Sequence, residues 1–340
     1  MVKKKEKEGE GKMKVKMQYA VDWATRKDIK ICNVKTGKVE SLPNQIDAWR
    51  KWFKKLNKRG SAKEILSTDL VLSPCEFYLE EGGGDSFKLL ARKLKHKIFT
   101  IPGVEVKRER NRMGLEKDDE TDALILRSMI GNGFSFRAFT ESDEVTAKIY
   151  LIYKGLEKTE ANLVQEKNRL FALTNQIELL SLDGFEKKLI DRQTELVKSL
   201  QNKFKTEFNL LKKIIHSTKE WTEFFEPIKG CGERTAGGIM GSIKNIGRFP
   251  HKFNLRSYGG MKKKKGNQNF CHSLKRALYF FAKGVIRQKN EEWYSLYLDM
   301  KRYYKNKHKE WTKAKLDNWA TKFIETKFLD KYYNYSKNGK

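Results

Sequence analysis

Acidic side chains in three separated stretches of this basic chain could bind divalent cations. The candidates are Asp22, a glutamate at either Glu80 or Glu81, and the pair Asp119 and Asp122. Neighbouring carboxylates repel one another when ionised, and a divalent cation relieves that repulsion. Carboxylate oxygens suit Mg²⁺ or Mn²⁺, and two such ions about 4 Å apart activate the attacking water and stabilise the leaving oxygen in phosphoryl transfer. The pattern therefore predicts a site with two Mg²⁺ or Mn²⁺ ions that hydrolyses phosphodiester bonds.

Each acid also has an ordinary structural explanation. Asp119 and Asp122 are three residues apart, so on a helix they share a face, but acids at this point could simply favour the positive end of that helix. For this pair alone the structural explanation is the stronger. Asp22 is harder to dismiss, because it follows Tyr-Ala-Val in an expected central strand, where a charge needs a partner.

The charge balance indicates a polyanionic partner. Lys and Arg total 72 against 43 Asp and Glu, a formal net charge of +29 among 340 residues. Such an excess is typical of proteins that bind nucleic acid. A membrane is not expected as a partner, because no apolar run approaches the roughly 20 residues that cross a bilayer.

The sequence also predicts a cytoplasmic location. Residues 1–16 alternate Lys, Glu and Gly without an apolar segment, so we expect a basic disordered tail and not a signal peptide. The four cysteines are scattered without CxxC spacing, which argues for a reducing compartment and against a disulfide framework or a zinc site.

Residues 17–140 read as an α/β domain. Strands are expected over 19–23, 28–34, 38–42, 77–80 and 97–101, with Asp22 closing the first and the glutamate closing the fourth. Amphipathic helices are expected over 44–57 and 86–97 and from residue 117 to 129. Strands that alternate with helices predict helices packed on a sheet.

The rest of the chain reads as helical. Leucines recur at helical spacing on both sides of a break at 181–184, which fits an antiparallel coiled-coil arm over 146–218 and equally fits one face of an ordinary bundle. Residues 219–335 form a third, glycine-rich helical region. Its glycines permit close backbone approach, either between helices or to a phosphate.

Several motifs resemble one protein family. The string KDDETDAL at 117–124 is similar to the KTDxxDA signature of the Piv-like DEDD transposases, which have RuvC-type catalytic domains. The stretch from residue 19 resembles the opening of that family, and EEGGGDSFKLLARKL resembles its second acidic motif. Alignment from the following helix favours Glu81, whereas counting apolar positions along the strand favours Glu80, so Glu81 is the preferred candidate and Glu80 stays open. Later stretches resemble the coiled coil and helical end of the family, in order, as far as residue 282.

The resemblance implies a fold and an activity. It implies an RNase H-like domain of RuvC type, followed by an all-α coiled-coil arm and a further helical domain. One departure is important, because the transposases carry a nucleophilic serine where this chain has only MKKKK at 261–265. Ser257 and Ser273 flank that stretch and read as structural serines. Without a covalent serine intermediate a strand can be hydrolysed but not rejoined, so the expectation moves from recombinase to nuclease.

The TIGR-associated (Tas) proteins fit that description. The chain resembles their TasR type, which joins a RuvC nuclease domain to a Nop-like RNA-binding domain. This resemblance implies a homodimer, formed through the coiled-coil arm, that binds a guide RNA and cleaves the target DNA paired to it.

Basic residues with interleaved aromatics indicate an RNA-binding patch in the Nop-like region. Lysines can contact phosphates and aromatic rings can stack on unpaired bases. The candidate residues are Arg248, Lys252, Arg256, Tyr258, Lys262, Lys263, Lys264, Lys265, Asn267, Lys275 and Arg276.

Two other functions stay open. The chain could be a bridge-RNA-guided transposase whose serine has been relocated to Ser273. It could instead be a non-catalytic scaffold of a ribonucleoprotein, similar to the box C/D particles, in which the acids have no catalytic role.

Overall fold

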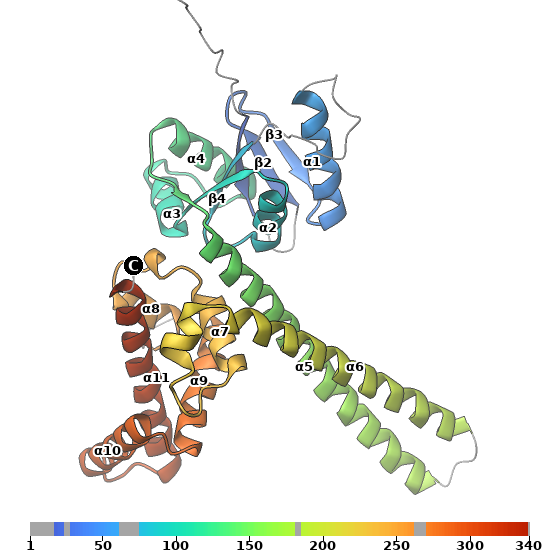
Figure 1. Cartoon of the computed structure of the whole chain (residues 1–340), viewed down its shortest axis with the longest axis vertical. Helices are drawn as coiled ribbons and strands as arrows, with labels where there is room; N and C mark the ends of the chain where they lie inside the picture. The colour runs from blue at the N-terminus through green and yellow to red at the C-terminus, as the bar shows by residue number, and fades with distance from the viewer. Residues whose placement is uncertain (1–16, 24–27, 61–74, 181–184, 262–269, 339–340) are drawn as a thin grey trace, which may run out of the picture. The chain divides into compact units, whose positions relative to one another are not determined.

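The chain divides into two compact units in a computed structural model, Met1–Thr140 and Glu141–Lys340. The structure describes residues 17–23, 28–60, 75–180, 185–261 and 270–338. It is a mixed α/β structure in which helices predominate (Figure 1). In the described part, no helix combines the length and apolarity needed to cross a bilayer.

The first unit is built on a six-stranded mixed sheet. Its strand order is β3-β2-β1-β4-β5-β6, with β1, β4 and β5 parallel and the remaining pairs antiparallel. The strands are β1 (Gln18–Asp22), β2 (Ile29–Asn33), β3 (Val39–Leu42), β4 (Glu76–Glu80), β5 (Lys97–Ile101) and β6 (Arg137–Ala138).

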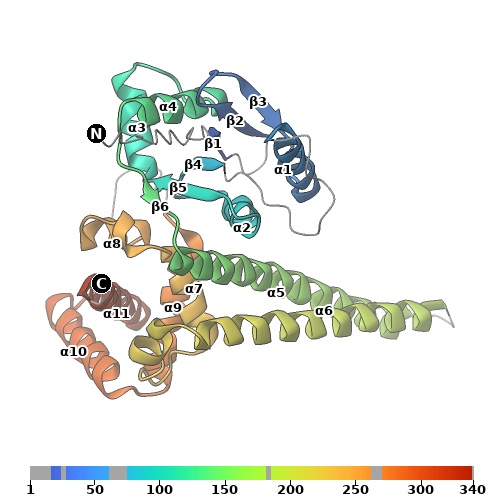
Figure 2. The ribbon, with the colours of Figure 1, turned by 45° about the horizontal axis from the view of Figure 1, so that its top comes forward.

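Two helices cover one face of the sheet with an aromatic core. These are α1 (Ile46–Gly60) and α2 (Asp85–Lys93), both drawn on the same side of the sheet in Figure 2. Side chains of a strand alternate between the two faces, so Tyr19 and Phe77, which are in register, point the same way. They pack with Trp52 and Phe53 of α1, ring against ring.

The opposite face is covered by α3 (Gly103–Arg112) and α4 (Asp119–Gly131) (Figure 2). Ala20 and Ile101 of the sheet pack there with Val106 of α3 and Leu126 of α4. Asp22 is two residues beyond Ala20, and Glu80 is in register with Ile101, so both acids belong to this face. The sheet register therefore decides which acids can meet.

Sequence patterns predicted most of the first unit and missed two elements. All five expected strands and three expected helices are present with boundaries shifted by a few residues. Helix α3 was missed because it buries the charged side chains of Glu109 and Arg110 beside Val106, so it shows no apolar periodicity. Strand β6 was missed because it has only two residues.

The second unit is helical throughout its described residues. Two long helices, α5 and α6, run antiparallel, and shorter helices pack around their inner ends (Figures 1 and 2). The elements are α5 (Glu141–Leu180), α6 (Phe185–His216), a π-helical turn (Trp221–Phe225), α7 (Glu233–Ile243), a 3₁₀ turn (Ile246–Arg248), α8 (Lys252–Tyr258), α9 (His272–Arg287), α10 (Glu291–Lys307) and α11 (Lys313–Asn338).

The helix pair combines the two structures that periodicity left open. Its inner part belongs to the core of the second unit, where Tyr153 of α5 and Leu211 of α6 pack with α7 and α9. Its outer part is an antiparallel hairpin, in which Gln193 Nε2 donates to Glu166 Oε2 at 2.7 Å. The expected turn at 181–184 lies outside the described residues.

Glycines of α7 permit helix packing. A Cβ at Gly238 would lie 2.7 Å from the Tyr153 ring and 2.8 Å from Ala277 Cβ, and one at Gly241 would lie 2.8 Å from the backbone of Tyr150. Larger residues would force α5, α7 and α9 apart. Of the two roles that the sequence left open, these glycines have the first, close approach between helices.

A buried histidine should make the first unit sensitive to acid. His96 is 1% exposed, stacks on Phe53 and accepts a hydrogen bond at Nδ1 from the Cys75 amide. Burial lowers its pKa from 6.5 to about 4. The native state therefore binds fewer protons than the unfolded chain between these values, and stability is lost as pH falls from 6.5 to 4. The loss should reach at most about 3 kcal/mol.

Chemical denaturation at pH 7 and pH 4.5 measures this effect. The His96→Asn variant, whose side chain does not titrate, should lose less stability over this interval than the wild type. The control is His251→Asn at an exposed position, which should keep the wild-type pH profile. If the His96→Asn variant and the wild type lose the same stability between pH 7 and pH 4.5, His96 is not the source of the acid sensitivity.

Candidate active site

The first two acids lie side by side at one edge of the sheet. Asp22 is the last residue of β1 and Glu80 the last residue of β4. These strands are parallel and Val21 pairs with Leu79, so Asp22 and Glu80 follow at the same level. Asp22 is only 8% exposed. Two carboxylates thus meet at the carboxyl ends of adjacent parallel strands, on the face that α3 and α4 cover.

Glu81 has a different environment from Glu80. It follows Glu80 directly, and its Oε1 accepts a hydrogen bond from Arg137 Nε at 3.2 Å. Its other oxygen, Oε2, is buried without a hydrogen-bond partner in the described part of the chain. The structure brings Glu80, and not Glu81, to Asp22. The strand count, rather than the alignment from the helix, agrees with this placement.

The remaining acids occupy the first turn of α4. Asp118 caps that helix, its side chain accepting from the amides of Glu120 and Thr121 at 3.1 and 3.3 Å. This cap sets the start of the helix, so Asp119 and Asp122 share a face three residues apart. Asp122 is buried, whereas Asp119 is half-buried.

Electrostatics show that the four carboxylates are close enough to influence one another. The pKa of Asp22 is raised from 3.8 to about 7, first by burial and then by the charges of Asp122, Asp119 and Glu80. The pKa of Glu80 is also raised, first by burial and then by Asp122, against the opposing charges of Lys117, Lys88 and Arg110. Each carboxylate that ionises makes ionisation of the next more difficult.

An arginine already neutralises one of these acids. Arg110 of α3 makes a bidentate pair with Asp122, its Nε and a terminal nitrogen each lying 2.7 Å from a carboxylate oxygen. The side chains are 11% and 7% exposed, and both would be unfavourable if buried alone. The pair therefore attaches α3 to α4 next to the predicted metal site.

The donor types fit a hard divalent cation, but the arrangement fits it only in part. Asp22, Glu80 and Asp119 offer the oxygen ligands that Mg²⁺ and Mn²⁺ prefer. Within the described ranges, however, no three Asp, Glu, His or Cys side chains lie close enough together to hold a metal ion. To act as a ligand, Asp122 would have to leave Arg110 for the cation, or contact Arg110 and the cation at the same time.

Two further residues position Glu80. Lys88 of α2 is 1% exposed, and its Nζ donates to the carbonyl oxygens of Glu80 and Glu81 at 3.1 and 3.2 Å. At the first residue of α3, a Cβ on Gly103 would lie only 1.7 Å from Glu80 Oε1. Sequence reasoning missed these residues together with Arg110.

Most described basic residues of the predicted RNA patch have acidic partners. Arg256 makes a bidentate pair with Asp330, and Lys275 Nζ lies 2.8 Å from the buried Glu325. Arg276 contacts Glu160 at 2.7 Å. These basic groups are therefore partly neutralised within the unit. Lys262, Lys263, Lys264, Lys265 and Asn267 lie outside the described residues.

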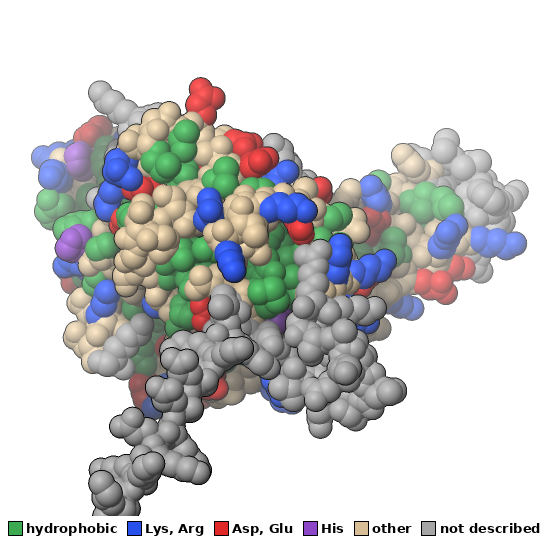
Figure 3. Space-filling model, turned by 90° about the horizontal axis from the view of Figure 1, so that it is seen from above, with side chains coloured by type: hydrophobic (Ala, Val, Ile, Leu, Met, Phe, Trp, Pro, Cys, Tyr) green, Lys and Arg blue, Asp and Glu red, His purple; other side chains and the backbone are tan. Residues whose placement is uncertain are grey.

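The other described members of the patch have different contacts. The Arg248 guanidinium lies over the rings of Phe249 and Tyr258, at 4.7 and 4.5 Å from their centroids. The Tyr258 hydroxyl donates to the carbonyl of Ser242, and Lys252 is exposed. Figure 3 shows one face of the molecule, on which blue and red side chains are interspersed among green and tan ones.

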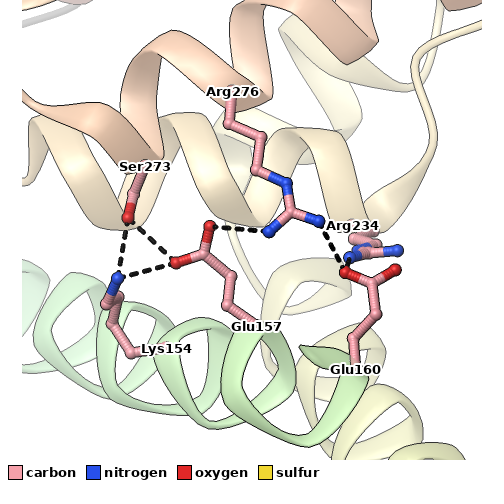
Figure 4. A network of polar contacts seen from close by, with 6 residues as sticks. All are labelled: Lys154, Glu157, Glu160, Arg234, Ser273 and Arg276. Atoms are coloured by element: carbon pink, nitrogen blue, oxygen red, sulfur yellow. Dashed lines mark hydrogen bonds and ion pairs between the residues drawn. The ribbon is translucent and has the colours of Figure 1, made fainter. Parts of the chain in front are cut away.

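Ser273 belongs to a buried polar network (Figure 4). It is 8% exposed, and its Oγ lies 2.9 Å from both Lys154 Nζ and Glu157 Oε2. Glu157 also pairs with Arg276, and Arg276 and Arg234 both contact Glu160. The network connects α5, α7 and α9.

Comparisons with known proteins add no family to this geometry. No protein-family model matches the chain, and no significant match to it was found among curated proteins.

Gly103 offers a test of the site that leaves the carboxylates in place. A methyl group in Gly103→Ala should displace Glu80, because the closest approach of 1.7 Å is far below contact distance. We expect Mn²⁺ binding, measured by calorimetry, to weaken about tenfold or more. Unfolding free energy should change by less than about 1 kcal/mol, since Ala suits a helix.

The matched control is Gly131→Ala at the end of α4, where an added Cβ meets nothing within 4 Å. It should bind Mn²⁺ like the wild type. If Gly103→Ala and Gly131→Ala bind the ion equally well, Glu80 does not contribute to the site in the way described.

Proposed function

We propose that the chain is a metal-dependent DNA endonuclease guided by a bound RNA. The observation that supports this most strongly is the pairing of β1 with β4, which puts Asp22 level with Glu80 at the carboxyl ends of parallel strands, where ligands commonly bind. Asp119 and Asp122 of α4 lie near enough to raise the pKa of Asp22. DNA as the substrate and RNA as the guide are proposed from the resemblance to the RuvC-type transposases and the Tas proteins.

The residues have separate tasks in this proposal. Asp22, Glu80 and Asp119 would hold the ions, and Asp122 would join them on release from Arg110. Bound Mg²⁺ or Mn²⁺ would supply activation of the attacking water and stabilisation of the leaving oxygen. Below about pH 7 Asp22 retains its proton, so it must lose that proton to act as a ligand. Lys88 and Gly103 keep Glu80 in place.

The positive charge of the chain supports a nucleic-acid partner. The net charge of +29 favours binding of phosphates. In an RNA-guided enzyme, base pairing selects the target and the protein contacts backbone and shape. Lys262 to Lys265, which lie outside the described residues, stay proposed RNA contacts. Arg256, Lys275 and Arg276 would need to exchange acidic partners for phosphates.

One observation favours a different function, a non-catalytic RNA-binding scaffold. Asp122 is paired with Arg110, and the described residues form no three-ligand metal group. Such a protein would keep its acids as part of the fold. By contrast, a transposase that uses Ser273 is disfavoured, because Lys154 and Glu157 hold that buried hydroxyl.

We also propose that the arm forms a homodimer. Val164 and Phe171 of α5 are 53% and 70% exposed, and Leu189 and Leu196 of α6 are 43% and 44% exposed. The two members of each pair are seven residues apart. Since Glu166 lies beside Gln193, all four positions fall along the same stretch of the hairpin. Apolar residues at this spacing are typical of a coiled-coil seam, and a second copy would cover them.

Plasmid cleavage tests the enzyme proposal. The RNA that co-purifies with the protein is sequenced, and a supercoiled plasmid with the matching target is incubated with the complex and Mg²⁺. We expect nicked or linear product. Asp22→Asn and Glu80→Gln should lower the rate by more than about a hundredfold, since even supporting residues of metal sites contribute about 10- to 100-fold.

Glu81→Gln is the matched control, because it makes the same chemical change one residue along the chain and should retain activity. RNA retention without cleavage in Mg²⁺ or Mn²⁺, unchanged by Asp22→Asn, would leave the scaffold as the function. A denaturation-resistant protein–DNA adduct abolished by Ser273→Ala would instead establish a transposase.

Sedimentation equilibrium tests the dimer. The double variant Phe171→Glu, Leu189→Glu should sediment as a monomer, because charges along the proposed seam repel across a two-fold interface. Its helix content should be unchanged, since both positions are exposed. The control, Lys198→Glu on α6, should remain dimeric. A monomeric wild type, or a dimeric double variant, would contradict the interface.

A further inference from the structure

A cluster of aromatic rings lies where α10 meets α11, apart from the core of the second unit. Trp311, between the two helices, stacks on His308 with centroids 3.9 Å apart and planes 3° apart. It also lies 5.9 Å from the ring of Tyr304 and 5.4 Å from that of Trp319. All four rings are half-buried, and none belongs to the hydrophobic core.

Basic residues surround this cluster with few acids to balance them. Residues 301–315 contain seven Lys and Arg and a single acid, Glu310. Two of the seven, Lys301 and Arg302, pair with Asp317 and Asp299 outside this stretch. Lys305, Lys309 and Lys313 are exposed and form no ion pair with any residue that the structure describes. Lys315 Nζ lies over the Trp311 ring, 4.5 Å from its centroid. Like charges this dense repel one another unless a polyanion lies between them.

The contrast with α8 and α9 is informative. There the basic side chains of Arg256, Lys275 and Arg276 are paired with acids. Near α10 and α11, Lys315 lies over an aromatic ring, and Lys305, Lys309 and Lys313 have no acidic partner among the described residues. Flat rings with a cationic border are the combination that binds single strands, because bases stack on the rings and phosphates contact the lysines.

We propose that this surface, made of the four rings with Lys305, Lys309, Lys313 and Lys315, binds an unpaired segment of nucleic acid. The Trp311 ring is half-buried, and a base would stack on it in place of Lys315, which lies over the ring. This assignment goes beyond the proposed nuclease and does not depend on the carboxylate site. The same chemistry would accept a single-stranded part of an RNA or a displaced strand of DNA.

Fluorescence anisotropy of the full chain tests the surface. The protein is freed of co-purified RNA and titrated in EDTA, so that metal-dependent cleavage plays no part. The probes are labelled 12-nucleotide RNA, DNA of the same sequence and the DNA duplex. We expect both single strands to bind more tightly than the duplex. Preference for RNA would indicate the RNA as the natural occupant, and preference for DNA the displaced strand.

Substitutions separate stacking from charge. Trp311→Ala should weaken binding of the single strand about tenfold or more, the effect of losing one stacked base. Trp311→Phe should retain most of the affinity, because it keeps a ring. A plot of log affinity against log salt has a negative slope. The triple change of Lys305, Lys309 and Lys313 to Ala should reduce the magnitude of that slope by about 2, since each phosphate contact contributes about 0.7.

The control is the triple change of Lys198, Lys205 and Lys213 to Ala, which removes the same charge from exposed positions of α6. It should leave the slope close to that of the wild type. The assignment is overturned if Trp311→Ala binds as the wild type does, if both lysine triples change the slope equally, or if polyglutamate competes as well as the oligonucleotide. Loss of cleavage at the carboxylate site would leave all of these measurements unaffected.

Discussion

Repulsion between buried carboxylates is the constraint that organises the first unit. The pairing of β1 with β4 brings Asp22 level with Glu80, and the cap at Asp118 sets the start of the helix that carries Asp119 and Asp122. Acids this close destabilise a fold unless a positive group compensates them. Arg110 compensates one of them, and the raised pKa values of Asp22 and Glu80 show that the compensation is incomplete.

The incomplete compensation distinguishes the two proposed functions. A scaffold would be more stable with every acid paired or replaced, since an uncompensated buried carboxyl contributes nothing to a fold. A metal enzyme needs the opposite, because ligands fully neutralised by arginine would not bind a cation. Among the described residues, Asp122 is paired with Arg110, whereas Asp22, Glu80 and Asp119 form no ion pair and keep their oxygens for a cation. This intermediate arrangement is the physical reason for preferring the enzyme.

Sequence patterns predicted the strands and helices that apolar periodicity and turn residues define. They located the strands that end in Asp22 and Glu80, because those strands are apolar and bounded by turns. They could not locate Arg110, because its long-range partner Asp122 is identified only by three-dimensional packing. A buried charge looks in sequence like a solvent-exposed one. The choice between Glu80 and Glu81 depended on a one-residue register, which the pairing of Val21 with Leu79 decides.

The same reasoning changes how the charge of the second unit is interpreted. Net charge describes a whole chain, but a phosphate responds to cations that no carboxylate already neutralises. Pairs such as Arg256 with Asp330 use their charge to hold helices together, whereas Lys309 and Lys313 have no such partner among the described residues. A nucleic-acid surface should therefore be sought where basic residues lie beside half-exposed rings. In the part of the second unit that the structure describes, the junction of α10 and α11 meets that condition, which periodicity and motif spacing alone did not reveal.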